Sequence, residues 1–412
     1  MENPKIRFKG FTKDWEQRKL NEVAEKICVG FVGTCEKFYT DESGIPMYRT
    51  GNLNGLSLNR DDLKYVTNEF HQHNQKSQLK AGDILIARHG DSGKAVNYEN
   101  SEEANCLNIV IIRPDFKKCN YKFLTNCINS PECQKHIKSL SAGSTQAVIN
   151  TSEIEKLGVV IPANIDEQNR IARYFSTLDN LITLHQRKCE QTKKLKKYML
   201  QKMFPRNGAK VPEIRFDGFT YDWEQRKLGD MGSTFTGLSG KTKEDFGHGD
   251  AQFITYMNVF SNPVANLEMT EAVEIDAKQN RVKKGDVFFT TSSETPEEVG
   301  MSCVMPENKD NIYLNSFCFG YRPTEKFDLD YLAYVLRADS FRKEMKFLAQ
   351  GISRYNISKN KVMEVSIPIP NLEEQTMVGR YFSTLDHLIT LHQRKCDELK
   401  KMKKYMLQNM FI

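Results

Sequence analysis

The sequence predicts an α+β protein in which two β-rich globular domains are separated by two long antiparallel helices, a coiled coil with pseudo-two-fold symmetry. Three observations predict this fold. Residues 173–189 return as residues 380–396, with His387 in place of Asn180 as the only change. Residues 4–20 return as residues 212–228 at fourteen of seventeen positions. Apolar side chains recur at spacings of three and four around the first phrase, which is typical of an amphipathic helix.

The repeated phrases frame two segments that are mostly unlike each other, residues 21–160 and 229–366. Each segment is long enough to bury a core of its own. We therefore divide the chain into four parts. The predicted boundaries are a first domain at 1–160 with entry segment 4–20, a long helix at 164–204, a second domain at 212–368 with entry segment 212–228, and a long helix at 371–412.

Each helix is expected to open with a capping box. Asn164 and Asn371 precede acidic residues, and Glu167 and Glu374 stand three positions further on. The first helix is expected to end before Pro205, which cannot continue it. The predicted buried stripe of that helix consists of Ile171, Phe175, Leu178, Ile182, Cys189, Thr192, Leu195 and Met199.

Chain connectivity sets the direction of the two helices. The second domain begins where the first helix ends, so the second helix must run back toward the first domain. About 38 residues at 1.5 Å each make a rod of roughly 55 Å, which predicts domains roughly 50 Å apart. An antiparallel pair of near-identical helices offers each of its surfaces twice. The alternative is a coiled coil that only joins two copies of the chain.

Composition predicts a protein without membrane spans. The 412 residues are 39% hydrophobic and 27% charged. No run of eighteen apolar residues occurs, and the N-terminus lacks the apolar core of a signal peptide, so we expect a cytoplasmic protein. The net charge of +6 permits an acidic partner. Residues 187–210 hold nine Lys or Arg and one acid, either a phosphate-facing strip or the solvated face of a helix.

The ten cysteines are scattered singly and are interpreted as reduced thiols. The nearest approach to metal-ligand spacing is Cys127, Cys133 and His136, for which buried cysteines in a helix are the preferred interpretation. No metal site is predicted. Enzyme motifs are missing too: no two prolines are adjacent, Gly240-Lys241-Thr242 lacks the first glycine of a P-loop, and no HExxH pattern occurs.

Both domains are predicted to place polar loops after similar strands. Residues 82–87 and 285–290 are strand-like, and each is followed by a polar loop, 88–94 or 291–295. These loops hold Arg, Lys, Asn, Gln, Ser and Thr, the side chains that read base edges in the DNA major groove. Equal architecture with unequal loops suits two readers of two different sequences.

At the level of motifs, the chain resembles the specificity subunits of type I restriction-modification systems over essentially its whole length. The entry phrase 6–15 and its copy 214–223 carry this resemblance. So do the exit phrases 165–168 and 372–375, each of which leads into Phe-Ser-x-Leu-Asp.

The resemblance implies a non-catalytic subunit with two target-recognition domains, each reading one half of an interrupted double-stranded DNA target. It implies that the helices bind two methyltransferase subunits and that ATP-dependent restriction subunits join them. It places S-adenosylmethionine, ATP and Mg²⁺ on those partners, so no cofactor is expected in this chain.

Contact residues are predicted by their positions in the loops. The candidates for DNA contact are Arg49, Asn52, Arg88, His89, Lys94, Ser144 and Gln146 in the first domain, and Tyr256, Asn258, Ser292, Arg354 and Tyr355 in the second. The candidates for partner binding are Tyr174, Phe175, Leu178, Tyr381, Phe382 and Leu385. Each DNA candidate has the alternative of an ordinary polar surface residue. Trp15 and Trp223 are predicted to anchor the entry segments in a core.

Two rival functions stay open at this stage. The first is a non-catalytic coiled-coil scaffold that bridges two protein-binding domains. The second is a self-contained modification enzyme whose site lacks a familiar motif. Salt-dependent DNA affinity separates the specificity subunit from the scaffold, because neutralised phosphates release counterions. DNA methylation or cleavage by the purified chain alone would establish the enzyme.

Overall fold

The protein folds into two units of similar architecture. The structure is a computed structural model that describes residues 3–53, 57–88, 93–140, 149–206 and 208–412. Unit 1 comprises Met1–Gln186 with Gln393–Ile412, and unit 2 comprises Arg187–His392. The units are described one at a time below.

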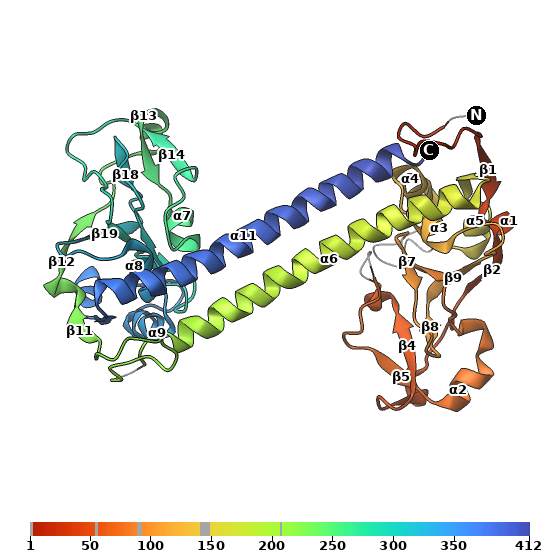
Figure 1. The fold of residues 1–412 in the computed structure, drawn as a ribbon, viewed down its shortest axis with the longest axis horizontal. Helices are drawn as coiled ribbons and strands as arrows, with labels where there is room; N and C mark the ends of the chain where they lie inside the picture. Colours follow the sequence, from red (N-terminus) through yellow and green to blue (C-terminus); the bar gives the residue numbers. More distant parts are fainter. Residues whose placement is uncertain (1–2, 54–56, 89–92, 141–148, 207) are drawn as a thin grey trace. The chain divides into compact units, whose positions relative to one another are not determined.

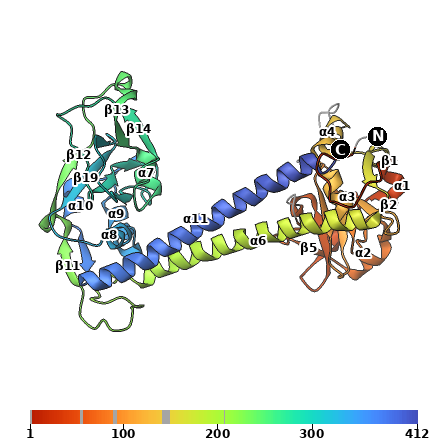
Figure 2. The same cartoon turned by 45° about the horizontal axis from the view of Figure 1, so that its top comes forward.

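The two long helices are α6 (Ile165–Lys202) and α11 (Leu372–Asn409), each of 38 residues, and each contributes to both units. In unit 1 the start of α6 lies beside the end of α11, as Figures 1 and 2 both show, and Lys403 Nζ lies 2.6 Å from Asp179 Oδ1. In unit 2 Lys196 Nζ lies 2.6 Å from Asp386 Oδ1. The helices run antiparallel within each unit, as predicted, because Phe175 of α6 contacts Phe411 while Asp179 pairs with the earlier Lys403.

Unit 1 contains two four-stranded sheets and one two-stranded sheet (Figure 1). The first sheet has the order β2-β9-β6-β7 and is antiparallel, and the second has the order β3-β5-β4-β8 with β4 and β8 parallel. The strands are β1 (Trp15–Lys19), β2 (Ala24–Val29), β3 (Tyr39–Thr40), β4 (Ile45–Arg49), β5 (Lys64–Val66), β6 (Asp83–Ala87), β7 (Ala95–Tyr98), β8 (Asn105–Leu107), β9 (Ile109–Pro114) and β10 (Gly158–Pro162). The shorter helices are α1 (Leu20–Val23), α2 (Asn68–His73), α3 (Tyr121–Ile128), α4 (Pro131–Leu140) and α5 (Thr151–Glu155).

Unit 2 repeats this plan with the corresponding strands in the same order along the chain. Its antiparallel sheet has the order β12-β19-β15-β17, and its second sheet has the order β14-β13-β18 with β13 and β18 parallel. The strands are β11 (Glu224–Lys227), β12 (Gly232–Thr236), β13 (Phe246–Ile254), β14 (Thr270–Val273), β15 (Val287–Thr290), β16 (Ser292–Ser293), β17 (Ser302–Val304), β18 (Ile312–Leu314), β19 (Cys318–Pro323), β20 (Tyr355–Asn356) and β21 (Ser366–Ile369). The shorter helices are α7 (Tyr256–Ser261), α8 (Leu329–Val335), α9 (Asp339–Leu348) and α10 (Lys359–Met363).

The strand-like runs predicted after Gly82 and Gly285 are strands β6 and β15, so both predictions are confirmed. Asp83 is the first residue of β6 and Asp286 immediately precedes β15, and each is buried and accepts hydrogen bonds from an arginine on the neighbouring strand. Asp83 receives Arg113 at 2.7 Å, and Asp286 receives Arg322 at 2.7 Å. A bidentate guanidinium–carboxylate pair of this kind fixes the register of two strands as well as their contact.

Glu167 and Glu374 join the entry segment of each unit to the start of its long helix. Glu167 accepts hydrogen bonds from Arg7 at 2.6 and 2.8 Å and from Trp15 Nε1 at 3.3 Å. Glu374 accepts the same three bonds from Arg215 and Trp223. One of the two hydrogen bonds of the predicted capping box at α11 is therefore wrong. Asn371 Oδ1 accepts from the Glu374 amide at 2.9 Å, as predicted. The Glu374 side chain, however, bonds Arg215 and Trp223 and does not return to the Asn371 amide.

The end of each long helix completes an aromatic core. Phe411 contacts the rings of Trp15, Phe123 and Phe175 in unit 1, and Phe204 contacts those of Trp223, Tyr331 and Phe382 in unit 2. Both tryptophans are buried, which confirms their predicted role as anchors. Entry strand β1 also pairs with β10, and β11 with β21, just ahead of each helix.

Candidate nucleic-acid interfaces

The predicted contact residues of unit 2 gather where strand β15 ends. Strands β16 and β20 pair there, with Ser292 opposite Asn356 and Ser293 opposite Tyr355. Tyr256, at the start of α7, donates its hydroxyl to the carbonyl of Ser292 at 2.7 Å. Tyr256, Ser292, Arg354 and Tyr355, which are up to 99 positions apart in sequence, therefore lie on connected segments.

The side chains of this cluster differ in exposure. Arg354 is exposed and Tyr355 is half-buried, so both can reach a ligand. Tyr256 stacks on Phe260 with ring centroids 6.0 Å apart, and burial raises the pKa of its hydroxyl. Ser292 is buried and its carbonyl holds Tyr256. We interpret Ser292 as positioning Tyr256, because its own side chain faces the interior.

The segment that carries Arg354 is a tight turn. The amide of Gln350 donates to the carbonyl of Asn356 at 2.9 Å, and the amide of Asn356 donates back at 2.8 Å. Gly351 has φ +148°, and a Cβ at this position would collide with the carbonyl oxygen of Arg354. The next amide, Ile357, donates to Thr291 at 3.0 Å and fastens the turn to the end of β15.

Unit 1 repeats this fastening at the end of β6. The amide of Ile149 donates to Arg88 O at 3.3 Å, and Arg88 Nε donates to Ile149 O at 3.4 Å. Arg88 is half-buried, and Lys94 is exposed just before β7. The predicted residues His89, Ser144 and Gln146 lie outside the described residues.

Two predicted readers do not fit the structure. Asn52 is buried, and its amide donates to Asn59 O and Asp61 O while its oxygen accepts from the Arg49 amide. Asn258 is 0% exposed. Its amide donates to Asn266 O and Met269 O, and its oxygen accepts from the Asn266 amide. Both amides are used inside their own loops, so neither side chain is available to a base.

Arg49 lies beside Asn52 with a partly exposed side chain. Its guanidinium donates to Asp62 Oδ2 at 2.8 Å, and hydrogen bonds from Lys64 and Arg49 lower the pKa of Asp62. The Nε atom of Arg49 is buried without a hydrogen-bond partner. DNA contact by Arg49 stays a prediction, and it would require the Arg49 guanidinium to release Asp62 and bind a phosphate or a base in its place.

The predicted partner-binding residues are mostly core residues. Phe175, Leu178, Phe382 and Leu385 are buried in their units, so this part of the prediction is wrong. Tyr174 and Tyr381 are half-buried beside Phe8 and Phe216 respectively, with centroids 6.1 Å apart in both cases. A helix that faces a globular core as well as a second helix buries more of its apolar stripe than periodicity alone indicates.

Several exposed apolar side chains of the long helices lie elsewhere. Leu195, predicted to be buried, is 41% exposed. Six of the exposed residues repeat at an interval of 207 positions, namely Leu184 with Leu391, Leu195 with Met402, and Tyr198 with Tyr405, whereas Leu181, Leu372 and Met377 have no exposed apolar counterpart. Leu184, Met402 and Tyr405 belong to unit 1, and Leu391, Leu195 and Tyr198 belong to unit 2. Each unit therefore carries one copy of this surface, which we name the exposed helix face.

Much of the basic segment 187–210 is neutralised locally. Lys202 and Arg206 pair with Glu213, and Lys210 pairs with Asp222. Lys193 pairs with Glu190 and Lys196 with Asp386. These pairs favour the solvated face of a helix over a phosphate-facing strip.

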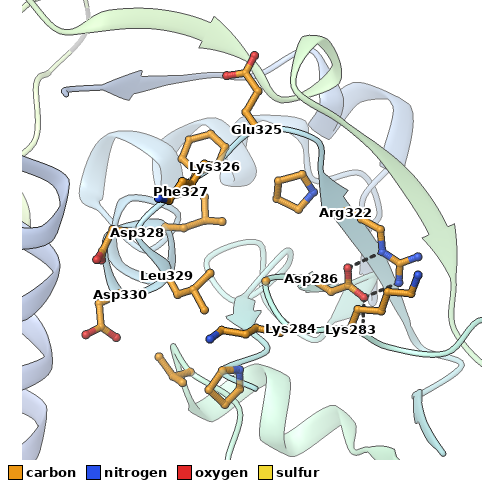
Figure 3. Close-up of a pocket in the computed structure, with 15 residues that line it drawn as sticks. Lys283, Lys284, Asp286, Arg322, Glu325, Lys326, Phe327, Asp328, Leu329 and Asp330 are labelled. Atoms are coloured by element: carbon orange, nitrogen blue, oxygen red, sulfur yellow. Dashed lines mark hydrogen bonds and ion pairs between the residues drawn. The ribbon is translucent and has the colours of Figure 1, made fainter. Parts of the chain in front are cut away.

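A hollow of about 740 Å³ lies on unit 2 away from these loops (Figure 3). Its wall contains the ion pair Asp286–Arg322, and Glu325, Lys326 and Asp328 line it from the segment between β19 and α8, as Figure 3 shows for the side chains. It contains none of the predicted contact residues. Unit 1 has the same ion pair, Asp83–Arg113, so we assign the pair to the fold that the two units share and not to a binding site.

Within the described ranges, no three His, Cys, Asp or Glu residues gather as a metal site would require. All ten cysteines are buried, and none of them forms a disulfide. Among the helices that the structure describes, none is both long and apolar enough to cross a membrane.

The chain is similar to proteins of known family over nearly its full length. A family model described as the type I restriction modification DNA specificity domain matches residues 12–194 and again 221–401. The putative type I restriction enzyme MjaX specificity subunit of Methanocaldococcus jannaschii is 25% identical, over 96% of this chain and 92% of that protein. The EcoKI specificity subunit of Escherichia coli K12 is 24% identical, over 83% and 75%.

Solved structures share the fold. The S subunit of a type I restriction-modification system from M. genitalium superposes with a TM-score of 0.64 at 15% identity, over 100% of this chain and 99% of that one. A chain from a study of type I complex assembly and conformational transition superposes with a TM-score of 0.52 at 15% identity, over 96% and 97%.

Proposed function

Because the chain belongs to the family of type I restriction-modification DNA specificity subunits, we propose that each unit reads one half of an interrupted DNA target. The observation that carries this proposal is the contrast between the core contacts that the two units share and the loops in which they differ. The contact of Glu167 with an arginine and a tryptophan of the entry segment recurs at Glu374, with the equivalent donor atoms. The loops that leave β6 and β15 instead differ in sequence and length.

In unit 2 we assign the reading role to the cluster around Arg354. A guanidinium presents two parallel donors, which match the O6 and N7 acceptors of guanine in the major groove. Arg354 is exposed on a turn held by paired backbone bonds, so it is positioned before DNA arrives. Tyr355 and Tyr256 flank it with side chains that can contact the backbone. In unit 1 the corresponding assignment is Arg88 with Lys94.

We assign the exposed helix face to the methyltransferase subunits, in place of the buried residues that the sequence suggested. Leucine, methionine and tyrosine side chains at half exposure are the composition of a protein interface rather than of a solvated helix. One copy on each unit fits two identical partners. In this proposal the chain is non-catalytic and cytoplasmic, and S-adenosylmethionine, Mg²⁺ and ATP are bound by the partner subunits.

The assignment of catalysis to partners has a direct test. Methylated bases are mapped across the genome of cells that hold the partner subunits, with and without this chain. We expect an interrupted two-part motif that is present only with the chain. Methylation by the purified chain alone would contradict the non-catalytic role. DNA affinity that is independent of salt would support the protein-binding scaffold instead.

The reading role of Arg354 is tested by Arg354→Ala, with Arg281→Ala as the matched control because Arg281 is an exposed arginine elsewhere on unit 2. Loss of a bidentate contact costs about 1–3 kcal/mol of base discrimination. We expect relaxed specificity in one half of the motif for Arg354→Ala and an unchanged motif for Arg281→Ala. Equal effects of both variants, or a change in both halves, would contradict the assignment.

A further inference from the structure

The turn that carries Arg354 also holds the most exposed apolar side chain of unit 2. Ile352 is 97% exposed at the tip of the turn between Gln350 and Asn356. Phe317 and Met257 are 59% and 54% exposed on adjoining segments. Phe317 O accepts from the Thr291 amide, and Met257 follows Tyr256, whose hydroxyl donates to Ser292. Three exposed apolar side chains thus surround the end of β15.

Single exposed apolar residues are common on protein surfaces and need no explanation. Ile352 differs because it is held in place. The turn is closed by two backbone hydrogen bonds, fastened by the Ile357 amide, and dependent on Gly351 at φ +148°. The chain thus presents a branched apolar side chain on a rigid tip, two residues before the cation assigned to base reading.

We propose that Ile352 contacts the C5-methyl group of a thymine in the half-target that unit 2 reads. The inference rests on the proposed function and specifies one base that unit 2 recognises. The thymine methyl is the one apolar group that base pairs present in the major groove. Arg354 on the same turn suits guanine acceptors in that groove, so both side chains approach neighbouring base pairs from one side.

The proposed requirement for a thymine methyl group applies to the half-target that unit 2 reads. Counting from Gly143 and Gly351, Ser144 stands in sequence where Ile352 stands, and Gln146 stands where Arg354 stands. Serine offers a hydroxyl in place of an apolar contact, and glutamine suits adenine where arginine suits guanine. The first half-target therefore serves as an internal control for any effect of thymine methyl groups.

The test uses the full chain assembled with its methyltransferase subunits and a duplex that contains the mapped motif. The half read by unit 2 is identified by its response to Arg354→Ala. Each thymine, on either strand, is then replaced by deoxyuridine, which removes only the methyl group, and binding is measured by titration. We expect one replacement in that half to weaken binding by about threefold to fivefold, the value for one buried methyl group.

The variants Ile352→Ser and Ile352→Val complete the cycle, and the exposure of Ile352 makes both compatible with the fold. Ile352→Ser should bind the thymine and deoxyuridine duplexes equally, whereas Ile352→Val should keep the preference for thymine. A half-target without thymine, or undiminished preference in Ile352→Ser, would overturn the inference and leave the proposed function intact. Absence of any two-part motif would instead overturn the proposed function.

Discussion

Two buried glutamates decide how each unit is closed. Glu167 and Glu374 are each 1% exposed and accept three hydrogen bonds from an arginine and a tryptophan of the entry segment. A buried carboxylate is tolerated only when its charge is paired and its oxygens are satisfied. Removing that charge leaves the partly exposed guanidinium without its carboxylate partner, and the cost exceeds what the pair contributes.

We therefore expect Glu374→Gln to lower the unfolding free energy of unit 2 by about 3 kcal/mol. Glu373→Gln is the matched control, since Glu373 is exposed at the same helix start and should change stability by less than about 0.5 kcal/mol. Hydrogen exchange of β15 and β19 amides measures the difference. Equal protection in the two variants would show that the contact is dispensable.

At the residue scale, the structure brings together three of the DNA-contact candidates, Arg354, Tyr355 and Tyr256, on connected segments at the end of β15. Their contact with DNA stays a prediction. Asn52 and Asn258 were misassigned, because an asparagine that ties its own loop has the same composition as one that reads adenine. The burial that separates these cases is a tertiary property.

At the scale of elements, a phenylalanine just beyond the end of each long helix fills the aromatic core of one unit. Phe411 is buried against Trp15, Phe123 and Phe175, although it stands one residue from the end of the sequence. The internal phrase Met203–Phe204 has the same role in unit 2. The shared Met-Phe at both helix ends was visible in sequence, but a chain end gives no periodic signal that predicts burial.

Phe411→Ala should destabilise unit 1 by about 3–5 kcal/mol, the usual cost of truncating a buried phenylalanine. Phe347→Ala is the control, because Phe347 is 84% exposed on α9 and should cost almost nothing. Chemical unfolding followed by Trp15 fluorescence, in a background that lacks Trp223, reports on unit 1. A decrease of less than about 1 kcal/mol in the unfolding free energy on truncation of Phe411 would contradict its role in the core of unit 1.

Buried thiols on the strands give the fold a sensitivity to alkali. Burial raises the pKa of Cys303 on β17 and of Cys119 to about 12. The unfolded thiol ionises near pH 9, so between pH 9 and 12 the unfolded state binds fewer protons and stability falls as pH rises. Cys303→Ala should flatten this fall relative to the wild-type protein in thermal melts at pH 8 and pH 10.5. An identical slope would show that this thiol does not ionise on unfolding.

At the scale of the whole molecule, unit 1 is built from both ends of the chain. The amide of Ile6 donates to Asn409 O at 2.9 Å, and in unit 2 Ile214 donates to Lys202 O at 3.0 Å. In both units the end of a long helix therefore contacts an entry segment through the same backbone hydrogen bond. The elements of unit 1 have the same order as those of unit 2 when the end of α11 is taken as preceding entry segment 4–20.

A circular permutant follows from this order. Joining Ile412 to Pro4 through a copy of residues 205–211, and opening the chain at residue 207, keeps the strand pairs and aromatic core contacts of both units and removes the hydrogen bonds of Asn3 with Asp14 and Arg7. We expect it to fold with unchanged thermal stability and to direct methylation to the same motif. Insoluble or partly folded permutant would show that the order of synthesis, rather than the final contacts, controls folding.

Exchange of one variable segment separates two independent readers from a single reading surface. Residues 229–366 are replaced by the corresponding segment of another specificity subunit, and methylated bases are mapped in cells that hold the partner subunits. We expect a two-part motif in which one half changes while the other half is kept. A contiguous motif, or a change in both halves, would contradict two independent readers on one frame.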